Sequence, residues 1–212
     1  MDANTLTLYT HPMSRGRVAR WMLEETGLPY ETELLEYGTT MKAPEYLAIN
    51  PMGKVPALKH GDVVVTENAA IAMYLAELVP DRQLAPPAGS PQRGPYYRWI
   101  SFMAPLEQLL MAKHVGKLGD PMSAGYGTEA DLLGTLEAAV DGRDFLAGDG
   151  FTAADLLVAA NIGFYLQFKM LEPRPAFVRF AELHKARPAA QRAEATDNAL
   201  MAKAKAAQAP AA

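Results

Sequence analysis

The sequence predicts an α/β domain followed by an all-helical domain. In the first 80 residues, apolar runs of strand length alternate with helical patterns, in the order strand–helix–strand and then strand–strand–helix. A segment rich in proline and glycine follows at 81–95, and beyond it every apolar pattern has helical spacing. We therefore expect an α/β domain at 1–80, a linker at 81–95 and a helical domain at 96–212, with a tail that frays from about residue 205.

The α/β domain should open with a strand at Thr5–Thr10, a helix that starts near Arg15, and a second strand at Tyr30–Leu35. Gly27 should end the helix, because glycine readily adopts the left-handed conformation found at helix C-termini. Short connections in such a unit imply a right-handed crossover and parallel strands. A short helix is expected next, at Pro44–Ala48. An antiparallel hairpin should follow, with one strand through Leu58 and the other at Val63–Val65. The last element is a helix at Ala69–Leu78, capped by Thr66.

Apolar side chains at helical spacing predict the helices of the second domain. The segment Thr152–Asp155 has the pattern of a capping box, and so has Thr128–Asp131. The helix that follows Thr152 is apolar on nearly all sides and therefore belongs in the core. The expected helices are Tyr96–Val115 with a kink at Pro105, Thr128–Val140, Thr152–Leu171, Pro175–Arg187 and Ala189–Ala204.

Composition narrows the possible functions. The chain has 212 residues, of which 50% are hydrophobic and 21% charged, as in globular proteins. A net charge of -4 argues against nucleic acid or an acidic membrane as the main partner. The absence of cysteine excludes a disulfide framework, a thiolate metal site and a cysteine nucleophile. No signal segment is visible at the start, and 153–166 is too short to span a bilayer, so we expect a soluble, cytoplasmic protein.

The start of the first helix has an unusual distribution of charge. Arg15, Arg17 and Arg20 lie in its first turns, where exposed N–H groups already carry partial positive charge. Together with the Ser14 hydroxyl, they suggest a site for a negatively charged group. The alternative is that Ser14 is only an N-cap and the arginines are solvated, and these residues alone leave both interpretations open.

Several segments together carry a resemblance to a known family. They are Ser14-Arg15 with Glu24–Glu31, Asn50–Pro56, Thr66–Asn68 with Ile71 and Tyr74-Leu75, Phe151–Asp155, and a last echo at Ala186–Ala189. In order and spacing they resemble the cytosolic glutathione S-transferases over nearly the whole chain, and Ser14-Arg15 most resembles the bacterial serine-type members. The resemblance implies a thioredoxin-like N-terminal domain that binds glutathione, a helical domain that supplies the pocket for a second substrate, and a homodimer.

The resemblance also implies that Ser14 and Arg15 activate the glutathione sulfur. A free thiol has a pKa of about 8.5, and lowering it by two units requires roughly 2.7 kcal/mol of preferential thiolate stabilisation. A hydroxyl that donates to the sulfur, a helix N-terminus and a nearby arginine each contribute to this. We expect the Ser14 hydroxyl to be the donor, with Thr10, His11 or the Arg15 side chain as alternatives.

By the same resemblance, two segments bind the rest of glutathione. Val55-Pro56 is expected to be a cis peptide whose Val55 backbone pairs with the cysteinyl part. Glu67 is expected to bind the ammonium of the γ-glutamyl group, and Asn68 its carboxylate, although the family usually has serine there. Lys54 and Lys42 are the expected partners of the glycyl carboxylate. The alternative for Glu67 and Asn68 is that they only cap the helix and bind no ligand, and the alternative for the two lysines is that they are solvated.

The expected pocket for the second substrate is lined by side chains that could equally be core residues, namely His11, Met13, Tyr97, Met103 and Met111. His11 has no second metal ligand at suitable spacing, so no metal is expected.

The main expectation is thus a transferase that joins reduced glutathione to an electrophilic, mainly apolar small molecule. The alternatives are another glutathione-dependent enzyme, such as an isomerase, dehalogenase or ether-cleaving enzyme, and a non-catalytic binding protein. Thiol–disulfide exchange is disfavoured because it needs a protein cysteine.

Overall fold

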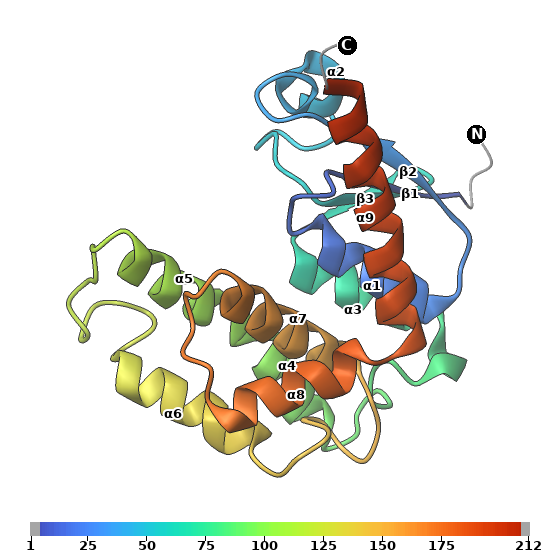
Figure 1. Cartoon of the computed structure of the whole chain (residues 1–212). Helices are drawn as coiled ribbons and strands as arrows, with labels where there is room; N and C mark the ends of the chain where they lie inside the picture. The colour runs from blue at the N-terminus through green and yellow to red at the C-terminus, as the bar shows by residue number, and fades with distance from the viewer. Residues whose placement is uncertain (1–4, 209–212) are drawn as a thin grey trace. The chain divides into compact units, whose positions relative to one another are not determined.

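The computed structural model describes residues 5–208, and side chains up to residue 206 (Figure 1). Its contacts divide the chain into two compact units. The first contains the residues up to Arg82 together with those from Arg187 onward, and the second is Gln83–Ala186. The first is built on a four-stranded sheet and the second is all-helical, so the predicted fold class is confirmed.

The sheet of the first unit has the order β2-β1-β3-β4. Strands β1 and β2 are parallel, as expected for the two ends of a strand–helix–strand unit, whereas β3 is antiparallel to both β1 and β4. This is the thioredoxin-like arrangement. Its strands are β1 (Leu6–Thr10), β2 (Tyr30–Leu34), β3 (Ala57–His60) and β4 (Val63–Thr66).

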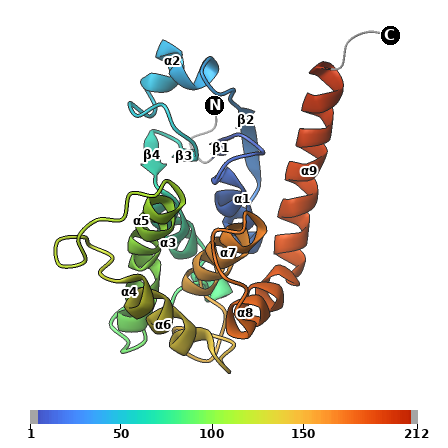
Figure 2. The same cartoon turned by 60° about the vertical axis from the view of Figure 1, so that its left-hand side comes forward.

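Helices cover both faces of this sheet. The alternation of side chains along β1 directs Leu6 and Leu8 to one face and Tyr9 to the other. Figure 2 shows α2 on the opposite side of the sheet from α1 and α3. On the α2 side, Tyr9 packs against Tyr46, with ring centroids 5.6 Å apart. The helices concerned are α1 (Gly16–Thr26), the 3₁₀ turn η1 (Thr40–Lys42), α2 (Pro44–Leu47) and α3 (Asn68–Leu78).

The last helix, α9 (Pro188–Gln208), belongs to the first unit and not to the helical unit in which the sequence analysis placed it. It lies alongside α1 (Figure 1). The contact includes the ion pair of Arg20 with Asp197, at 2.9 Å and with both side chains 1% exposed, and the ion pair of Arg187 with Glu25 at 2.7 Å. A buried arginine needs a partner, and Asp197 provides it from a distant part of the sequence.

The second unit packs its helices around α7, which contacts α4, α5 and α8. Thr152 and Asp155 form the predicted capping box at the start of α7, and Thr128 caps α6 through Asp131 as expected. The helices of this unit are α4 (Arg93–Ser101), α5 (Met103–His114), α6 (Glu129–Val140), α7 (Ala153–Gln167) and α8 (Pro175–Lys185).

The single helix expected over 96–115 is in fact two helices, α4 and α5, separated at Phe102. Pro105 has no N–H to donate to the Ser101 carbonyl four residues back, so the interruption expected from this proline is present, as a break between two helices and not as a kink within one. Pro105 lies in the first turn of α5, where a backbone N–H would have no helical partner and its absence costs little. Helix α4 also begins inside the expected linker, at Arg93.

Three further helix boundaries differ from expectation. Thr66 is the last residue of β4 and does not cap α3, because Glu67 occupies the cap position. Helix α7 ends at Gln167, short of the expected Leu171, since Lys169 has a φ of 56° and the N–H groups of residues 170 and 171 bond back to Tyr165. Helix α9 continues to Gln208, and the rest of the tail expected to fray lies outside the described residues. Within residues 5–208, no helix has both the length and the apolar character needed to cross a bilayer.

Candidate functional site

The register of the sheet places three of the predicted site segments at the same end of its strands. Tyr9 of β1 pairs with Ala57 of β3, and Ala57 pairs with Thr66 of β4. Three segments therefore leave the sheet at the same end of its strands: the turn that follows β1, the Val55-Pro56 peptide that precedes β3 and the Glu67-Asn68 segment that follows β4. A direct contact joins two of them, because the Asn68 side-chain amide donates to the Arg15 carbonyl oxygen at 3.1 Å.

Ser14 lies in the turn before α1, and its hydroxyl makes two hydrogen bonds. The hydroxyl donates to the His11 carbonyl oxygen at 2.7 Å and accepts the Gly16 N–H at 2.9 Å. The backbone N–H of Ser14 also donates to the His11 carbonyl, at 2.9 Å. If the hydroxyl rotated toward a ligand, the His11 carbonyl would keep this second donor. The single proton of Ser14 is thus engaged locally but can be redirected without stranding a backbone group.

Thr10 is fully buried, and its hydroxyl has no hydrogen-bond partner among the described residues. The hydroxyl lies against Gly16: a Cβ atom placed on that glycine would be 1.9 Å from Thr10 Oγ1 and 2.9 Å from Ser14 Oγ. This burial leaves Thr10 no surface for a ligand, which weakens its candidacy as the sulfur donor. The contact also explains why the first residue of α1 is a glycine.

Two of the three arginines near the start of α1 do not point toward an anion site. Besides its ion pair with Asp197, Arg20 donates to the side chains of Tyr30 and Thr32. Burial lowers the pKa of Arg20, but the Asp197 carboxylate and the Tyr30 hydroxyl together outweigh this effect and the net pKa is above the usual value, so the guanidinium stays charged. Arg17 donates to Asn198 of α9 at 2.5 Å. Of the two interpretations left open, a common anion site or solvated side chains, neither describes Arg17 and Arg20, because both are bonded to α9, which lies along α1.

The Val55-Pro56 peptide is cis, as the resemblance implied. The carbonyl of Lys54 accepts hydrogen bonds from the Tyr46 hydroxyl at 2.5 Å and from the Asn50 amide at 2.8 Å, which fixes the loop that leads into this peptide. Val55 itself is partly exposed.

Lys42 is brought to the same loop, since its ammonium donates to the Met52 carbonyl at 2.9 Å. Gly53 has a φ of 57°, and a Cβ atom there would lie 2.5 Å from the Met41 carbonyl and 2.8 Å from Lys42 Nζ. The side chains of Lys42 and Lys54 are both exposed. The ammonium of Lys42, at the end of η1, is thus bonded to the backbone of the short loop that carries Lys54.

Glu67 has an unusual backbone conformation for a residue with a side chain, with φ 68° and ψ 125°. Such a conformation costs of the order of 1–3 kcal/mol and is retained where the surrounding structure or a function demands it. The Glu67 side chain is exposed. Beside it, one N–H of the Asn68 amide is used by Arg15, and Asn68 Oδ1 is buried without a hydrogen-bond partner among residues 5–208.

Glu36 and Tyr37, which the sequence analysis did not single out, flank the turn that carries Ser14. His11 Nε2 lies 3.5 Å from a Glu36 carboxylate oxygen, and its ring is 4.7 Å from that of Tyr37. The Tyr37 hydroxyl donates to the Met13 carbonyl at 3.4 Å. Burial raises the pKa of Tyr37, and the Ser14 hydroxyl acts in the opposite direction. These two residues follow β2 in sequence, and no local pattern connects them with the turn after β1.

The residues predicted to line the second-substrate pocket fall into both units. In the first unit, Met13 is exposed and His11 is mostly buried beside Glu36 and Tyr37. In the second unit, Tyr97 and Met111 are exposed, whereas Met103 is 7% exposed and offers little surface to a ligand. Within the described part of the chain, no group of three or more His, Asp or Glu side chains is arranged to hold a metal ion.

Comparison with known proteins gives consistent similarities. Residues 4–77 match the family model described as the N-terminal domain of glutathione S-transferase. Glutathione S-transferase GST-4.5 of Xanthomonas campestris pv. campestris is 31% identical over 159 residues, which cover 71% of this chain and 78% of that protein.

Solved structures agree with this result. A glutathione transferase from Methylococcus capsulatus has a TM-score of 0.76 at 28% identity, covering 91% of this chain and 98% of that one. A sphingomonad glutathione S-transferase complexed with glutathione has a TM-score of 0.70 at 28% identity, with the same coverage of 91% and 98%.

Proposed function

The chain belongs to the glutathione S-transferase family, and on this basis we propose that it conjugates reduced glutathione to an electrophilic, mainly apolar small molecule. The observation that carries the proposal is the convergence of three segments at one end of the strands, with Asn68 of α3 bonded to Arg15 just before α1. These segments hold every residue proposed to contact the sulfur and γ-glutamyl ends of the tripeptide.

Ser14 is the proposed donor to the glutathione sulfur, which makes the chain a serine-type member. Its hydroxyl accepts the Gly16 N–H, and a hydroxyl that accepts a hydrogen bond is a better donor. On binding, the proton would turn from the His11 carbonyl to the thiolate. Arg15 and the N–H groups at the start of α1 add positive potential and further favour the thiolate, which is the nucleophile.

The remaining contacts are proposed along the length of glutathione. The backbone of Val55 pairs with the cysteinyl unit as an added strand would. The Glu67 carboxylate binds the γ-glutamyl ammonium, and the backbone N–H and remaining amide N–H of Asn68 bind the γ-glutamyl carboxylate. Lys54, on the loop before Val55, and Lys42, whose ammonium is bonded to that loop at Met52, are the proposed partners of the glycyl carboxylate.

The exposed side chains Met13, Tyr97 and Met111 are proposed to meet the second substrate, together with His11 and the edge of Met103. A homodimer, a cytoplasmic location and a role in detoxification complete the proposal, by analogy with the family.

Isothermal calorimetry followed by a conjugation assay tests the proposal. Titration with millimolar reduced glutathione should give saturable heat, and the complex should conjugate a chloronitrobenzene. Saturable binding without conjugation would favour another glutathione-dependent reaction or a binding protein. The absence of any saturable heat would reject glutathione as the ligand.

The variant Glu67→Gln tests the proposed contact with the γ-glutamyl group. It keeps the size of the side chain but removes the charge proposed to pair with the γ-glutamyl ammonium. We expect glutathione affinity to fall about tenfold, within the range for a lost charged hydrogen bond. S-methylglutathione should lose the same factor, because it retains the γ-glutamyl group, and an unequal loss would contradict the assigned contact.

A further inference from the structure

Tyr37 lies on the segment that follows β2, yet its hydroxyl reaches the turn that holds Ser14. The hydroxyl donates to the Met13 carbonyl at 3.4 Å, which is longer than usual for a hydrogen bond from a hydroxyl to an oxygen. Burial raises the pKa of Tyr37, and a hydrogen bond with the Ser14 hydroxyl acts in the opposite direction. The two hydroxyls therefore lie within hydrogen-bonding reach of each other, and that of Tyr37 stays protonated at neutral pH.

The oxygen of Ser14 has room for one more hydrogen bond. A hydroxyl can donate one hydrogen bond and accept two. Within residues 5–208, the Ser14 hydroxyl donates to the His11 carbonyl and accepts the Gly16 N–H, which leaves one acceptor position. This position stays open when the proton of Ser14 turns toward a ligand, so a second donor can then bind there.

Tyr37 is held beside this turn by its neighbours. Its ring packs against that of His11, with the centroids 4.7 Å apart. His11 is fixed in turn, because its Nδ1 accepts the Met13 N–H at 3.1 Å and its Nε2 lies 3.5 Å from a Glu36 carboxylate oxygen. Since Nδ1 is an acceptor, the ring proton of neutral His11 lies on Nε2 and faces Glu36. The phenol is thus in place before any ligand binds.

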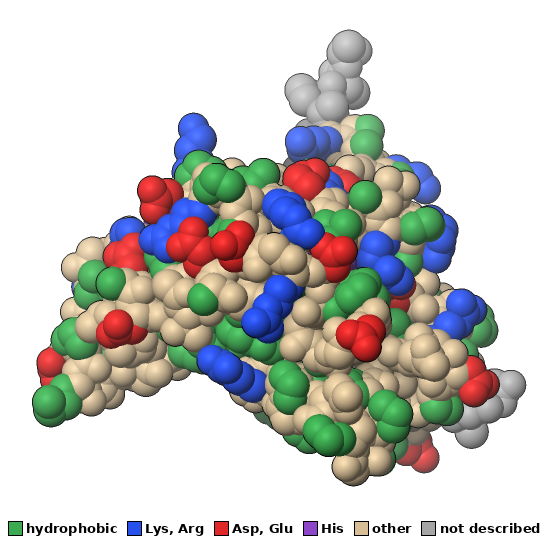
Figure 3. All heavy atoms as spheres, turned by 90° about the horizontal axis from the view of Figure 1, so that it is seen from below, with side chains coloured by type: hydrophobic (Ala, Val, Ile, Leu, Met, Phe, Trp, Pro, Cys, Tyr) green, Lys and Arg blue, Asp and Glu red, His purple; other side chains and the backbone are tan. Residues whose placement is uncertain are grey.

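The overall charge of the chain, -4, does not favour a bound thiolate. Basic and acidic side chains are mixed over the face shown in Figure 3, so neither sign dominates there. Salt screens exposed charges beyond about 10 Å, so a thiolate must be stabilised mainly by groups close to it. A change in one nearby hydrogen bond should therefore be measurable in the thiol pKa of bound glutathione.

We propose that Tyr37 is a positioning residue whose hydroxyl makes Ser14 a stronger hydrogen-bond donor to the glutathione sulfur. As the Ser14 proton turns from the His11 carbonyl to the sulfur, the Tyr37 proton turns from the Met13 carbonyl to the Ser14 oxygen. Each proton stays on its own oxygen, so only hydrogen bonds are exchanged. Hydrogen bonds in series strengthen one another by about 10–30% per bond. This role rests on the proposed function, in which Ser14 donates to the sulfur.

The thiol pKa of bound glutathione tests this role without a second substrate, because the ultraviolet absorbance of the thiolate reports it. The full-length protein, saturated with reduced glutathione, is titrated with base. The same titration with S-methylglutathione, which has no thiol, is subtracted to remove the absorbance of the tyrosines. The measurement is made on the unmodified protein, on Tyr37→Phe, on Ser14→Ala and on the double variant.

Tyr37→Phe should raise the pKa of the bound thiol by about 0.5, which is less than the rise expected for Ser14→Ala. In the Ser14→Ala background the same change should have no effect, because no hydroxyl remains to transmit it. The side chain of Tyr37 is 57% exposed, so its replacement leaves the core intact. The charged or titratable groups around it, His11, Glu36 and Arg15, are the same in Tyr37→Phe, so the rise reports the lost hydroxyl.

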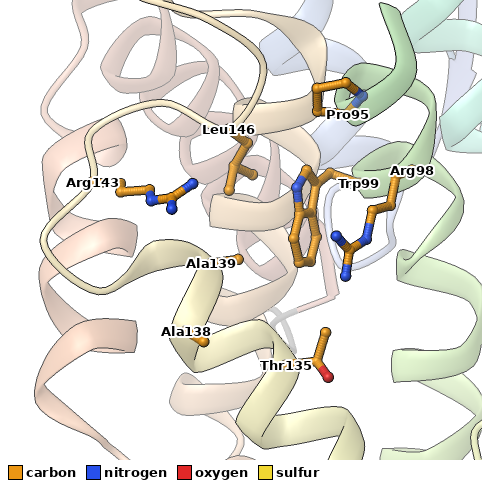
Figure 4. A pocket seen from close by; sticks show the side chains of 8 residues that line it. All are labelled: Pro95, Arg98, Trp99, Thr135, Ala138, Ala139, Arg143 and Leu146. Carbon is orange, nitrogen blue, oxygen red and sulfur yellow. The ribbon is translucent and has the colours of Figure 1, made fainter. Parts of the chain in front are cut away.

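Two variants that lose a hydroxyl elsewhere serve as controls. Tyr74→Phe, in α3 of the first unit, removes a hydroxyl that lies 2.8 Å from His60 Nδ1. Thr135→Val, in the second unit, removes a hydroxyl from the wall of a cavity of about 470 Å³ between α4 and α6 (Figure 4). Both variants should leave the pKa of the bound thiol unchanged.

Each opposite result would overturn the proposal. An unchanged pKa in Tyr37→Phe would mean that Tyr37 only supports the turn, even if the affinity for glutathione fell. An equal rise with and without the Ser14 hydroxyl would mean that Tyr37 contacts the sulfur itself. A rise of the same size in either control would assign the effect to a general loss of structure. A bound thiol with the pKa of free glutathione in the unmodified protein would contradict the proposed function as well.

Discussion

The Ser14 hydroxyl donates to the His11 carbonyl at 2.7 Å, so its one proton is engaged before any ligand binds. The proposed chemistry requires this proton to turn to the glutathione sulfur. A hydrogen bond to a charged group is worth about 1.5–3 kcal/mol, or roughly one to two pKa units. Ser14→Ala should therefore raise the thiol pKa of bound glutathione by this amount, shift the rate–pH profile upward and lower kcat/KM at neutral pH at least about tenfold.

Ser14→Thr is the control for this prediction, because it keeps a hydroxyl at the same place. It should retain most of the activity and the original pH profile. A profile for Ser14→Ala that matches the unmodified protein would move the donor role to the Arg15 side chain or to the Tyr37 hydroxyl, which lies 3.4 Å from the neighbouring Met13 carbonyl.

Two substitutions of Glu67 should change the stability of the fold and the affinity for glutathione independently. Its φ of 68° favours glycine, so Glu67→Gly should relieve backbone strain and stabilise the fold by about 1 kcal/mol. In a chain of this size, that corresponds to a rise of about 2–4 °C in Tm. The same change removes the carboxylate, so glutathione affinity should fall. Glu67→Gln should lose affinity without the gain in Tm, and a lower Tm for Glu67→Gly would show that the backbone there is not strained.

Two glycines in helices should respond to alanine in opposite ways. Gly16→Ala would place a Cβ atom 1.9 Å from Thr10 Oγ1, so the turn that holds Ser14 must shift. Overpacking of this kind typically costs about 1–3 kcal/mol, and activity should fall as well. Gly134 of α6 has no atom within 4 Å of such a Cβ, so Gly134→Ala should stabilise the protein by about 0.5–1 kcal/mol. Urea unfolding measures both changes, and a stabilised Gly16→Ala would contradict the described packing.

The buried pair of Arg20 with Asp197 should behave as one unit. Arg20→Met leaves the Asp197 carboxylate buried without its partner, which costs about 3–5 kcal/mol. Replacing both partners, as Arg20→Met/Asp197→Leu, should recover most of this loss, because Asp197 Oδ2 and one Arg20 nitrogen have no partner within residues 5–206 even in the intact pair. Denaturant unfolding of the two single variants and the double variant provides the cycle. A double variant no more stable than Arg20→Met would show that α9 is not held by this pair.

Asp155 should make stability depend on pH. Burial raises its pKa to about 6, although hydrogen bonds from Thr152 and Leu146 act in the opposite direction. Since the folded pKa exceeds the unfolded value of 3.8, the contribution of this group to stability is fully present below about pH 4 and is lost as pH rises through about 6.

The stability difference between the unmodified protein and Asp155→Asn should therefore shrink from pH 4.5 to 7.5, by roughly 2 kcal/mol. Throughout this range the variant should remain the less stable. Its amide has one oxygen in place of two, so it cannot replace both the acceptor of the Leu146 N–H and the acceptor of the Thr152 N–H. Asp131→Asn, in the exposed cap of α6, controls for the removal of a negative charge. A difference that stays constant with pH would contradict the raised pKa.

Local patterns in the sequence predicted those elements whose cause is local. The strands β1 and β4, the cap of α6 by Thr128 and the capping box of α7 each depend on residues within a few positions of one another. The cis Val55-Pro56 peptide was expected from family resemblance and is present. Pro105 was expected to kink one long helix, and the break three residues before it, at Phe102, follows from the same missing N–H.

The features that the sequence did not reveal depend on contacts between distant residues. Helical spacing shows that Arg17 and Arg20 share a polar stripe but not that α9 covers it, some 180 residues later. In the same way, Glu36 and Tyr37 reach the Ser14 turn through the sheet, because β1 and β2 are parallel neighbours. The strained backbone of Glu67 has no sequence signal, since glutamate is not a residue that favours positive φ.

The return of α9 to the first unit has a consequence for biosynthesis. The ribosome makes the strands and α1 first, yet α9, which packs on α1, emerges only after the helical unit. Until then, the Arg20 charge has no counterion and one side of α1 is bare. The nascent α/β portion therefore stays incomplete while the whole helical unit is translated, and a chain that stops before α9 would lose the packing of α1.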